Sequence, residues 1–478
     1  MKKIKTDICI IGAGSGGLSV AAGAVQLGLK TILIEHHKMG GDCLNAGCVP
    51  SKSYLAAAKQ ANHFRKSHIH GITPQPPKID FAKVKNHITQ VINTIAPNDS
   101  VERFTKLGVK VIKSAGKFID KHQIKAGDNI IHARNIVIAT GSSAVIPPIA
   151  GLDKIDKKKI FTNETIFALR TRPKHLIIIG GGPIGIEMAQ AHARLGIKVS
   201  VIDHSNILPR DDQDAVRIIK HQLEKDGVVF YEHATINHSG QGTKGDVYLA
   251  ISQKKPIKIT GTHILVAAGR KSNIQNLDLD KADIKTNGRS IIVDKKLRTN
   301  HKHIFAIGDC NGGPQFTHAA GYQAGLVIRQ VCFKMPAKVD YTALPWVTYT
   351  DPELAQVGMN ELMAQQKYGK KYKTTIWHFD DNDRAVAEKE TSGFIKILTD
   401  KTGRIIGGTM VGCHAGDMIL TIGLAISKKL KISDLAGIIA PYPTRGDIIK
   451  RAAGSYYTPI LFSQKTRRIV KYLQYLPW

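Results

Sequence analysis

The chain has 478 residues, 42% of them hydrophobic, so it is long enough for two to four domains rather than one small core. No run of about 18 uninterrupted apolar residues occurs, which argues against a membrane-spanning helix. The formal net charge is +30, but the basic residues are dispersed and no nucleic-acid-binding motif accompanies them, so nucleic acid is not an expected partner.

The first predicted unit covers residues 6–35 and consists of a buried strand, a turn, a helix and a second strand. Gly12, Gly14 and Gly17 fit the pattern G-x-G-x-x-G directly after the first strand, and Glu35 closes the second strand. The glycines allow a tight turn and let a pyrophosphate approach the helix N-terminus, while the acid can accept hydrogen bonds from a ribose. The unit therefore predicts a dinucleotide site.

Two closely spaced cysteines, Cys43 and Cys48, come next. With four residues between them, a regular helix would separate their Cα atoms by about 7.5 Å along its axis alone. A disulfide rarely tolerates more than about 7 Å. If the two are bonded, at least one lies on a distorted turn, which Gly47 permits and Pro50, having no N–H, reinforces.

The Ala-rich segment 53–61 is predicted to continue as helix, which places a thiol near a helix N-terminus. That position and the charge of Lys52 lower a thiol pKa. Because no second Cys/His pair at ligand spacing follows, the pair favours a redox dithiol over an inert disulfide or a metal site. The other four cysteines are scattered, which fits a reducing cytoplasm with one special pair.

The nucleotide pattern repeats at residues 175–203. Gly180, Gly182 and Gly185 occupy the fingerprint positions and Asp203 ends the second strand. An acid there favours the free 2′-hydroxyl of NADH over the 2′-phosphate of NADPH, although basic groups nearby leave NADPH open. These basic groups are Lys198, His204 and Arg210. Two sites and one dithiol suggest electron flow from nicotinamide to flavin to disulfide, with the flavin in the first site because the dithiol follows it.

Three further strand-and-turn stretches close the nucleotide-binding regions: 136–142, 264–270 and 299–309, the last followed by a predicted helix over 318–331. Each alone indicates only a buried strand with a turn, whereas their order is much more specific. The candidate cofactor-binding residues that they add are Thr140, Gly141, Gly269 and Asp309.

Taken in order, these motifs resemble the flavoprotein disulfide reductases, the class I pyridine nucleotide-disulfide oxidoreductase family that includes glutathione reductase, dihydrolipoamide dehydrogenase and mercuric reductase. The resemblance covers essentially the whole chain. It implies an α/β fold with two Rossmann-like domains, for FAD and NAD(P), and an α+β C-terminal dimerisation domain in a homodimer. The expected limits are 1–150 and 271–344 for the FAD-binding parts, 151–270 for NAD(P) and 345–478 for dimerisation, with strands at 346–355 and 393–398.

The resemblance also implies residue roles. Cys43 would be the interchange thiol that meets the substrate, and Cys48 the charge-transfer thiol against the flavin. Lys52 would lie near the flavin ring and pair with Glu187. Asp309 would hold the ribityl chain of FAD, and Glu35 its adenosine ribose.

One departure concerns the acid/base residue of the dimerisation domain. Family members with disulfide substrates carry His-Pro-Thr and then a glutamate, whereas here Tyr442 stands in the histidine position and Asp447 in that of the glutamate. A phenol with a pKa of about 10 is a poor base near neutral pH. Mercuric reductases have Pro-Tyr at this position, but this chain lacks their terminal Cys pair and an N-terminal Cys-x-x-Cys domain. The favoured electron acceptor is thus a metal ion or another acceptor that needs no histidine base, in an enzyme that resembles mercuric reductase. The alternative function is that of a dihydrolipoamide dehydrogenase.

The stretch 464–478 alternates basic with apolar or aromatic residues. The pattern favours a helix packed on the dimer over one that touches a membrane surface. Together with the charge of +30, it supports a hypothesis of another class, a basic membrane-surface redox partner or sensor with slow turnover of its own.

Overall fold

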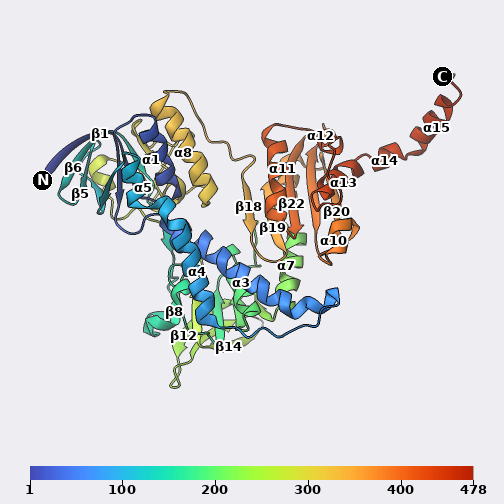
Figure 1. The fold of residues 1–478 in the computed structure, drawn as a ribbon, viewed down its shortest axis with the longest axis horizontal. Helices are drawn as coiled ribbons and strands as arrows, with labels where there is room; N and C mark the ends of the chain where they lie inside the picture. Colours follow the sequence, from blue (N-terminus) through green and yellow to red (C-terminus); the bar gives the residue numbers. More distant parts are fainter. Residues whose placement is uncertain (254, 477–478) are drawn as a thin grey trace. The chain divides into compact units, whose positions relative to one another are not determined.

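The computed structural model describes residues 1–253 and 255–476, so the last two residues of the basic stretch lie outside the described residues. The chain divides into two compact units (Figure 1). Unit 1 comprises Met1–Phe64, Pro76–Ser205 and Val229–Asp340, and unit 2 comprises Arg65–Gln75, Asn206–Val228 and the chain from Tyr341 onward.

Unit 1 contains a seven-stranded sheet in the order β3-β2-β1-β6-β5-β4, with β17 paired to β6. Its parallel part positions the first glycine turn, because β1 ends there and pairs with β2 and β6. Helices α1 and α8 pack against each other beside this sheet. The bounds are β1 (Lys2–Ile11), α1 (Ser15–Gln26), β2 (Thr31–Glu35), β3 (Lys110–Lys113), β4 (Gly116–Phe118), β5 (Gln123–Ala126), β6 (Asn129–Ile138), β17 (Ile304–Ala306) and α8 (Thr317–Cys332).

A second parallel sheet in unit 1 has the order β11-β10-β9-β15-β8, and α6 follows β9 through the second glycine turn. The bounds are β8 (Ile160–Phe161), β9 (His175–Ile179), α6 (Pro183–Arg194), β10 (Lys198–Ile202), β11 (Val228–Tyr231) and β15 (His263–Val266). Smaller antiparallel sheets join β12 (Thr235–Gln241), β13 (Val247–Ser252) and β14 (Pro256–Gly261), and β7 (Ser142–Ala144) with β16 (Arg270–Ser272). Helices α4 (Phe81–Ile95) and α5 (Val101–Lys106) also belong to this unit.

Unit 2 is built on a five-stranded antiparallel sheet in the order β18-β19-β22-β21-β20, covered by α11 and α13 over a buried aliphatic core. The strands are β18 (Pro345–Thr348), β19 (Glu353–Gly358), β20 (Tyr372–His378), β21 (Phe394–Asp400) and β22 (Ile405–Gly412). The helices include α7 (Gln213–Lys225), α9 (Glu361–Tyr368), α10 (Asp383–Ala387), α11 (Ala415–Ser427), α12 (Ile432–Ala436), α13 (Asp447–Ser455), α14 (Thr458–Leu461) and α15 (Gln464–Leu473).

The strand expected over 346–355 is wrong as a single element. The chain forms β18, reverses through residues 349–352, and returns as β19, which pairs with β18 antiparallel. Pro352 has no amide hydrogen to donate to a sheet, so it marks the interruption. The expected strand over 393–398 is present as β21, and the expected helix over 318–331 as α8.

The basic stretch is helical over Gln464–Leu473, and Figure 1 shows α14 and α15 extending away from the sheet of unit 2. Within residues 1–253 and 255–476, the structure has no helix that meets the length and hydropathy needed to cross a bilayer.

Candidate functional site

The cysteine pair lies on a broken helix in unit 1. Cys43 belongs to α2 (Gly41–Asn45), which ends at Ala46 with φ −146°, and Cys48 begins the separate helix α3 (Cys48–Lys66). The break at Ala46 and Gly47 confirms the distorted turn that the cysteine spacing predicts, and α3 confirms the helix over 53–61. The break lets two residues five positions apart face each other, because the helical rise is interrupted between them.

The two thiols have different acidities. The Sγ of Cys48 lies 3.3 Å from the Oγ1 of Thr317 on α8. The hydrogen bond from Cys43 lowers the pKa of Cys48 to about 6; burial opposes this shift, and Thr317 and the charge of Lys52 reinforce it. The same bond, together with burial, raises the pKa of Cys43. In the reduced pair, Cys48 is therefore the thiolate. Thr317 is a functional contact that sequence reasoning missed, since it lies 269 residues away.

We expect alkylation of Cys48 in the reduced protein to reveal this acidity. Because the thiolate is the nucleophile and its pKa is lowered, the iodoacetamide rate should rise through a pH of about 6 and be lost below it. The Thr317→Val variant removes one hydrogen bond to the thiolate, so its profile should shift toward higher pH. Peptide mass spectrometry would measure both rates, and a Cys48 profile centred at the ordinary pKa near 9 would contradict the assignment.

A partly buried ion pair within unit 1 joins the helix that carries Cys48 to the helix that follows the second glycine turn. The Nζ of Lys52 on α3 donates to the Oε2 of Glu187 on α6 at 2.9 Å. The Glu187 side chain is only 6% exposed, whereas that of Lys52 is 36% exposed. The contact confirms the Lys52–Glu187 pairing that the resemblance predicts, and it orients one side chain from each nucleotide-binding part toward the other.

The first glycine turn has the shape that a bound pyrophosphate requires. Gly12 has φ +106°, and a Cβ on Gly17 would lie 1.9 Å from the carbonyl oxygen of Gly12, so neither position accepts a larger residue. A Cβ on Gly14 would meet nothing within 4 Å, which leaves that side of the turn open. The second turn repeats all three features. Gly180 has φ +111°, a Cβ on Gly185 would clash with the carbonyl oxygen of Gly180, and a Cβ on Gly182 would meet nothing within 4 Å.

Each turn is tied to the acid that ends the following strand. Glu35 accepts hydrogen bonds from the amide of Ala13 (2.7 Å) and from that of His37 (2.6 Å). Asp203 repeats the arrangement, accepting hydrogen bonds from the amides of Gly181 (2.6 Å) and Ser205 (2.7 Å). Each carboxylate is thereby held at the carboxyl edge of a parallel sheet, next to its glycine turn.

Asp309 lies at the end of the third strand-and-turn stretch. Its carboxylate accepts a hydrogen bond from the Oγ of Ser142 and lies 3.9 Å from the guanidinium of Arg270. Burial raises the pKa of Asp309, and the Ser142 bond opposes that shift. Among the neighbouring candidates, Gly141 (φ +68°) and Gly269 (φ +125°) face open space, and Thr140 donates to the carbonyl oxygen of Asn273.

Tyr442 and Asp447 both lie in unit 2, but they do not bond to each other. The Tyr442 hydroxyl donates to the carboxylate of Asp383 at 2.7 Å, whereas Asp447 accepts from Arg451 at 3.0 Å. The Asp383 hydrogen bond raises the pKa of Tyr442, so its hydroxyl stays protonated. Asp383, at the start of α10, was not predicted, because nothing in the local sequence links it to Tyr442.

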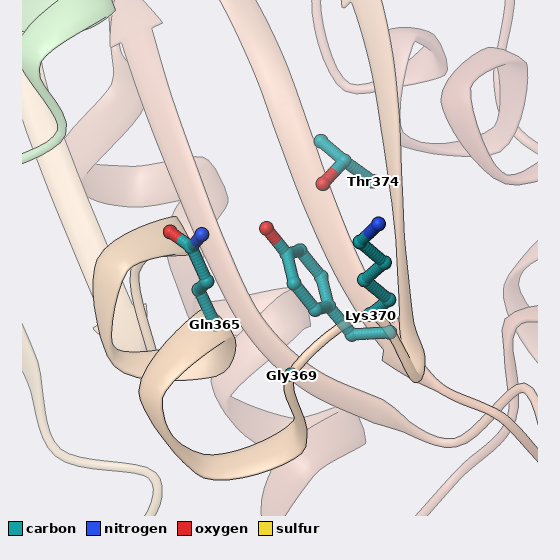
Figure 2. Close-up of a pocket in the computed structure, with 5 residues that line it drawn as sticks. Gln365, Gly369, Lys370 and Thr374 are labelled. Carbon is teal, nitrogen blue, oxygen red and sulfur yellow. The ribbon is translucent and has the colours of Figure 1, made fainter.

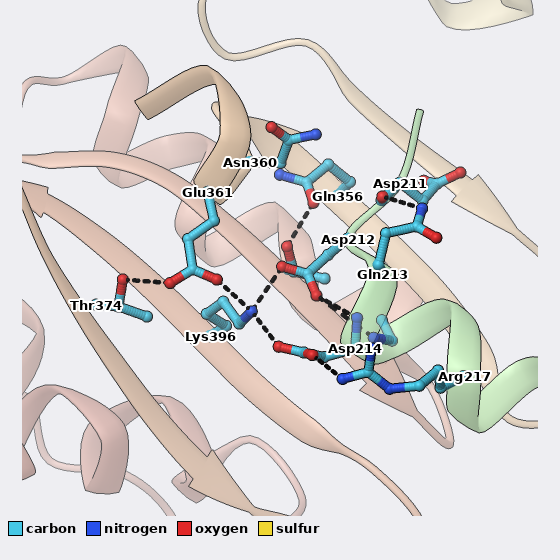
Figure 3. A network of polar contacts seen from close by, with 12 residues as sticks. Asp211, Asp212, Gln213, Asp214, Arg217, Gln356, Asn360, Glu361, Thr374 and Lys396 are labelled. Carbon is cyan, nitrogen blue, oxygen red and sulfur yellow. Dashed lines mark hydrogen bonds and ion pairs between the residues drawn. The ribbon is translucent and has the colours of Figure 1, made fainter. Parts of the chain in front are cut away.

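Two further features of unit 2 lie apart from these residues. A surface pocket of 390 Å³ beside α9 and β20 is lined by Gln365, Gly369, Lys370, Tyr372 and Thr374 (Figure 2) and includes none of the predicted site residues. Figure 3 shows the second feature, the buried ammonium of Lys396 on β21. It contacts three carboxylates at 2.7–2.8 Å, those of Asp212, Asp214 and Glu361.

Two glycine turns with a dithiol between them are shared with a known family. A family model described as pyridine nucleotide-disulphide oxidoreductase matches residues 6–324, and the model of its dimerisation domain matches residues 344–453. The chain belongs to this family. Its members bind FAD and use NAD(P)H, and the dimerisation domain supports a homodimer.

The relatives of this oxidoreductase catalyse different reactions, as their names state. A mercuric reductase from Bacillus cereus is 33% identical over 93% of this chain and 70% of its own length. A dihydrolipoyl dehydrogenase from Geobacillus stearothermophilus is 34% identical over 94% of this chain and 96% of its own. Among solved structures, the Cu(II) complex of the HOCl-induced flavoprotein disulfide reductase RclA from Escherichia coli has a TM-score of 0.84 at 26% identity, covering 93% of this chain and 99% of that one.

The residues of this oxidoreductase fit both cofactors. Each glycine turn leaves one side open for a pyrophosphate and offers a helix N-terminus to it. Helix α2, which carries Cys43, begins against the first turn, because a Cβ on Gly41 would lie 2.6 Å from the Cα of Gly14. A flavin held by that turn would therefore be close to the dithiol.

Proposed function

We propose that this protein uses its Cys43–Cys48 pair to reduce a metal ion, in the manner of a mercuric reductase and with NADH as the preferred donor. The observation that carries the proposal is the environment of Tyr442. Its hydroxyl donates to Asp383 and has a raised pKa, so it cannot serve as the base that a disulfide substrate needs. Asp203 supports NADH, because its carboxylate would repel a 2′-phosphate.

The proposed binding residues follow the two turns. The adenosine diphosphate part of FAD would be held by Gly12, Gly14, Gly17 and Glu35, and its ribityl chain by Asp309. The FAD site would be completed by Thr140 and Gly141. The adenosine diphosphate part of NADH would be held by Gly180, Gly182, Gly185 and Asp203, with Gly269 completing that site. The domain limits near residues 150, 270 and 344 belong to the same proposal.

FAD bound at the first glycine turn would supply two-electron transfer from NADH to the Cys43–Cys48 disulfide. The disulfide accepts the equivalent of a hydride and opens into a thiolate at Cys48 and a thiol at Cys43. The pair of sulfurs then binds a soft divalent metal ion and passes two electrons to it, the disulfide re-forms, and the Cys43 proton is released. Each cycle thus converts one NADH and one divalent ion into NAD⁺, one proton and the reduced metal.

The protein's own charges suit these steps. Thr317 and Lys52 stabilise the thiolate form of Cys48, which binds metal more tightly than a thiol. Lys52 and Glu187 hold each other between the two nucleotide-binding parts, where they would position the nicotinamide against the flavin. In the homodimer, Tyr442 and Asp447 of one subunit would complete the active site of the other.

Dihydrolipoamide dehydrogenase is the second candidate, supported by a relative that is aligned over 96% of its own length. Cu(II) is a further candidate acceptor, because a relative of similar fold has been solved as a Cu(II) complex. Its reduction to Cu(I) takes one electron, so one NADH would reduce two copper ions and release one proton.

An acceptor panel of Hg(II), Cu(II), lipoamide, glutathione disulfide and quinones would test the proposal. We expect NADH-dependent turnover with a metal ion and little with either disulfide. Tyr442→His should increase lipoamide turnover by about a hundredfold, since it supplies a base of suitable pKa, whereas the matched variant Tyr442→Phe should not. Robust lipoamide turnover by the wild type would contradict the metal-ion proposal and favour the second candidate.

A further inference from the structure

Helix α15 presents an apolar stripe that the described part of unit 2 leaves uncovered. Ile469, Val470 and Leu473 lie at the spacing of one helix face, and each side chain is roughly half exposed, at 49–50%. Leu476, three residues beyond the end of the helix, is 53% exposed. None of the residues in α15 is buried. The preceding short turn adds three more exposed apolar residues, Ile460, Leu461 and Phe462.

The opposite face of α15 is strongly basic. It carries Arg467, Arg468 and Lys471, with Lys465 at the border of the apolar stripe, and no acidic residue follows Asp447 in the sequence. Tyr472 and Tyr475 are more than two-thirds exposed. Basic residues, an apolar face and exposed aromatic rings together are the features of a helix that lies in the plane of a membrane surface.

The charge of the chain favours a lipid surface over a second copy as the occupant of this face. The homodimer forms through the dimerisation domain, and a copy with a net charge of +30 offers the basic face of α15 no net attraction. This argues against the packing on the dimer that the sequence pattern favours. An anionic leaflet instead offers negative headgroups to the basic face and acyl chains to the apolar one. The family's dimerisation model ends at residue 453, before α15 begins.

We propose that residues 458–476 form an interfacial anchor that binds anionic phospholipid. Helix α15 has 10 residues and is therefore about 15 Å long, half the thickness of a bilayer core, so it lies on the surface rather than across it. The apolar stripe enters the acyl boundary while Lys465, Arg467 and Arg468 contact headgroup phosphates. This anchor would hold the enzyme at a membrane whichever electron acceptor it uses.

Co-sedimentation of the full-length, FAD-loaded protein with phosphatidylcholine vesicles, with and without phosphatidylglycerol, tests the anchor. We expect binding only when phosphatidylglycerol is present, with a decrease at high salt. The double variant Arg467→Glu/Arg468→Glu should lower the partition coefficient by at least about tenfold, because each basic residue near an anionic surface adds about 1 kcal/mol. Ile469→Asn/Leu473→Asn should lower it comparably without changing the net charge.

The matched control is Lys157→Glu/Lys158→Glu, which makes the same charge change at two adjacent exposed lysines of unit 1. It should keep most of the vesicle binding, and all variants should keep their flavin content. Equal loss in this control, or undiminished binding of Ile469→Asn/Leu473→Asn, would overturn the proposal in favour of diffuse attraction by the whole basic surface. A change of oligomeric state in the α15 variants without any change in vesicle binding would overturn it in favour of a second copy.

Discussion

Replacing Cys48 with serine should lower NADH-dependent acceptor reduction by at least about a thousandfold, since a hydroxyl neither forms a disulfide nor ionises near neutral pH. Cys43→Ser should be equally inactive, because the same disulfide is lost. The two variants should differ in their absorption spectra. Cys43→Ser removes the Cys43 thiol, but the serine hydroxyl can still donate to Cys48, and Thr317 and Lys52 continue to stabilise its thiolate. This variant should therefore show a long-wavelength thiolate-to-flavin band without added reductant. Cys48→Ser should lack this band in every redox state.

Cys332→Ser serves as the control for this pair. Cys332 is half-buried at the end of α8 and belongs to none of the predicted site residues, so its variant should keep both the activity and the band of the wild type. The assignment of the thiolate to Cys48 would be wrong if the band appeared in Cys48→Ser and not in Cys43→Ser.

The second large effect concerns Lys396, whose side chain is 1% exposed and surrounded by acids. Burial disfavours its charged form, but hydrogen bonds to Asp212, Asp214 and Glu361 outweigh that cost and raise its pKa. Lys396→Met would leave these carboxylates facing one another without a cation. We expect a loss of about 3 kcal/mol, the lower end for breaking a buried ion pair, because Asp214 and Glu361 remain partly open to water.

Tryptophan fluorescence would measure this loss. Trp346 donates to Asp211 at 2.7 Å, one residue from the cluster, so its emission reports on unit 2. The midpoint of thermal unfolding should fall by roughly 6–12 °C, and the exposed-surface control Lys401→Met should leave it unchanged.

Two conditions should restore the stability of Lys396→Met. Without the ammonium, the facing carboxylates repel one another, and protonation relieves that repulsion only in the folded state, so the variant should gain stability relative to the wild type as pH falls. Calcium should also stabilise it, because one oxygen from each of the three acids lies within 4.8 Å of the others, which suits a cation with oxygen ligands. Equal midpoints for the variant and the wild type would show that the ion cluster does not hold unit 2 together.

The predictable parts of this molecule are those set by local backbone chemistry. The glycine turns follow from dihedral needs within a few residues, and the break before Cys48 follows from a spacing that a regular helix cannot accommodate. Thr317 and Asp383 were not predictable, because each reaches its partner only after distant segments have packed. The Lys396 cluster is of the same kind, since its acids come from α7 and α9 and its ammonium from β21.

The double tethering of Glu35 and Asp203 has a consequence for changing the coenzyme preference. Each carboxylate accepts one hydrogen bond from the glycine turn and another from the segment that follows its own strand. It therefore stabilises the local fold in addition to its proposed role as a ribose acceptor. Substituting Asp203 to admit a 2′-phosphate would release three charge-assisted hydrogen bonds, from the Gly181 amide and from the amide and hydroxyl of Ser205, each worth about 1.5–3 kcal/mol. The side chain of His204 is 90% exposed and lies 3.3 Å from the same carboxylate. Substitutions at His204 can therefore change the local charge while the hydrogen bonds to Asp203 are kept.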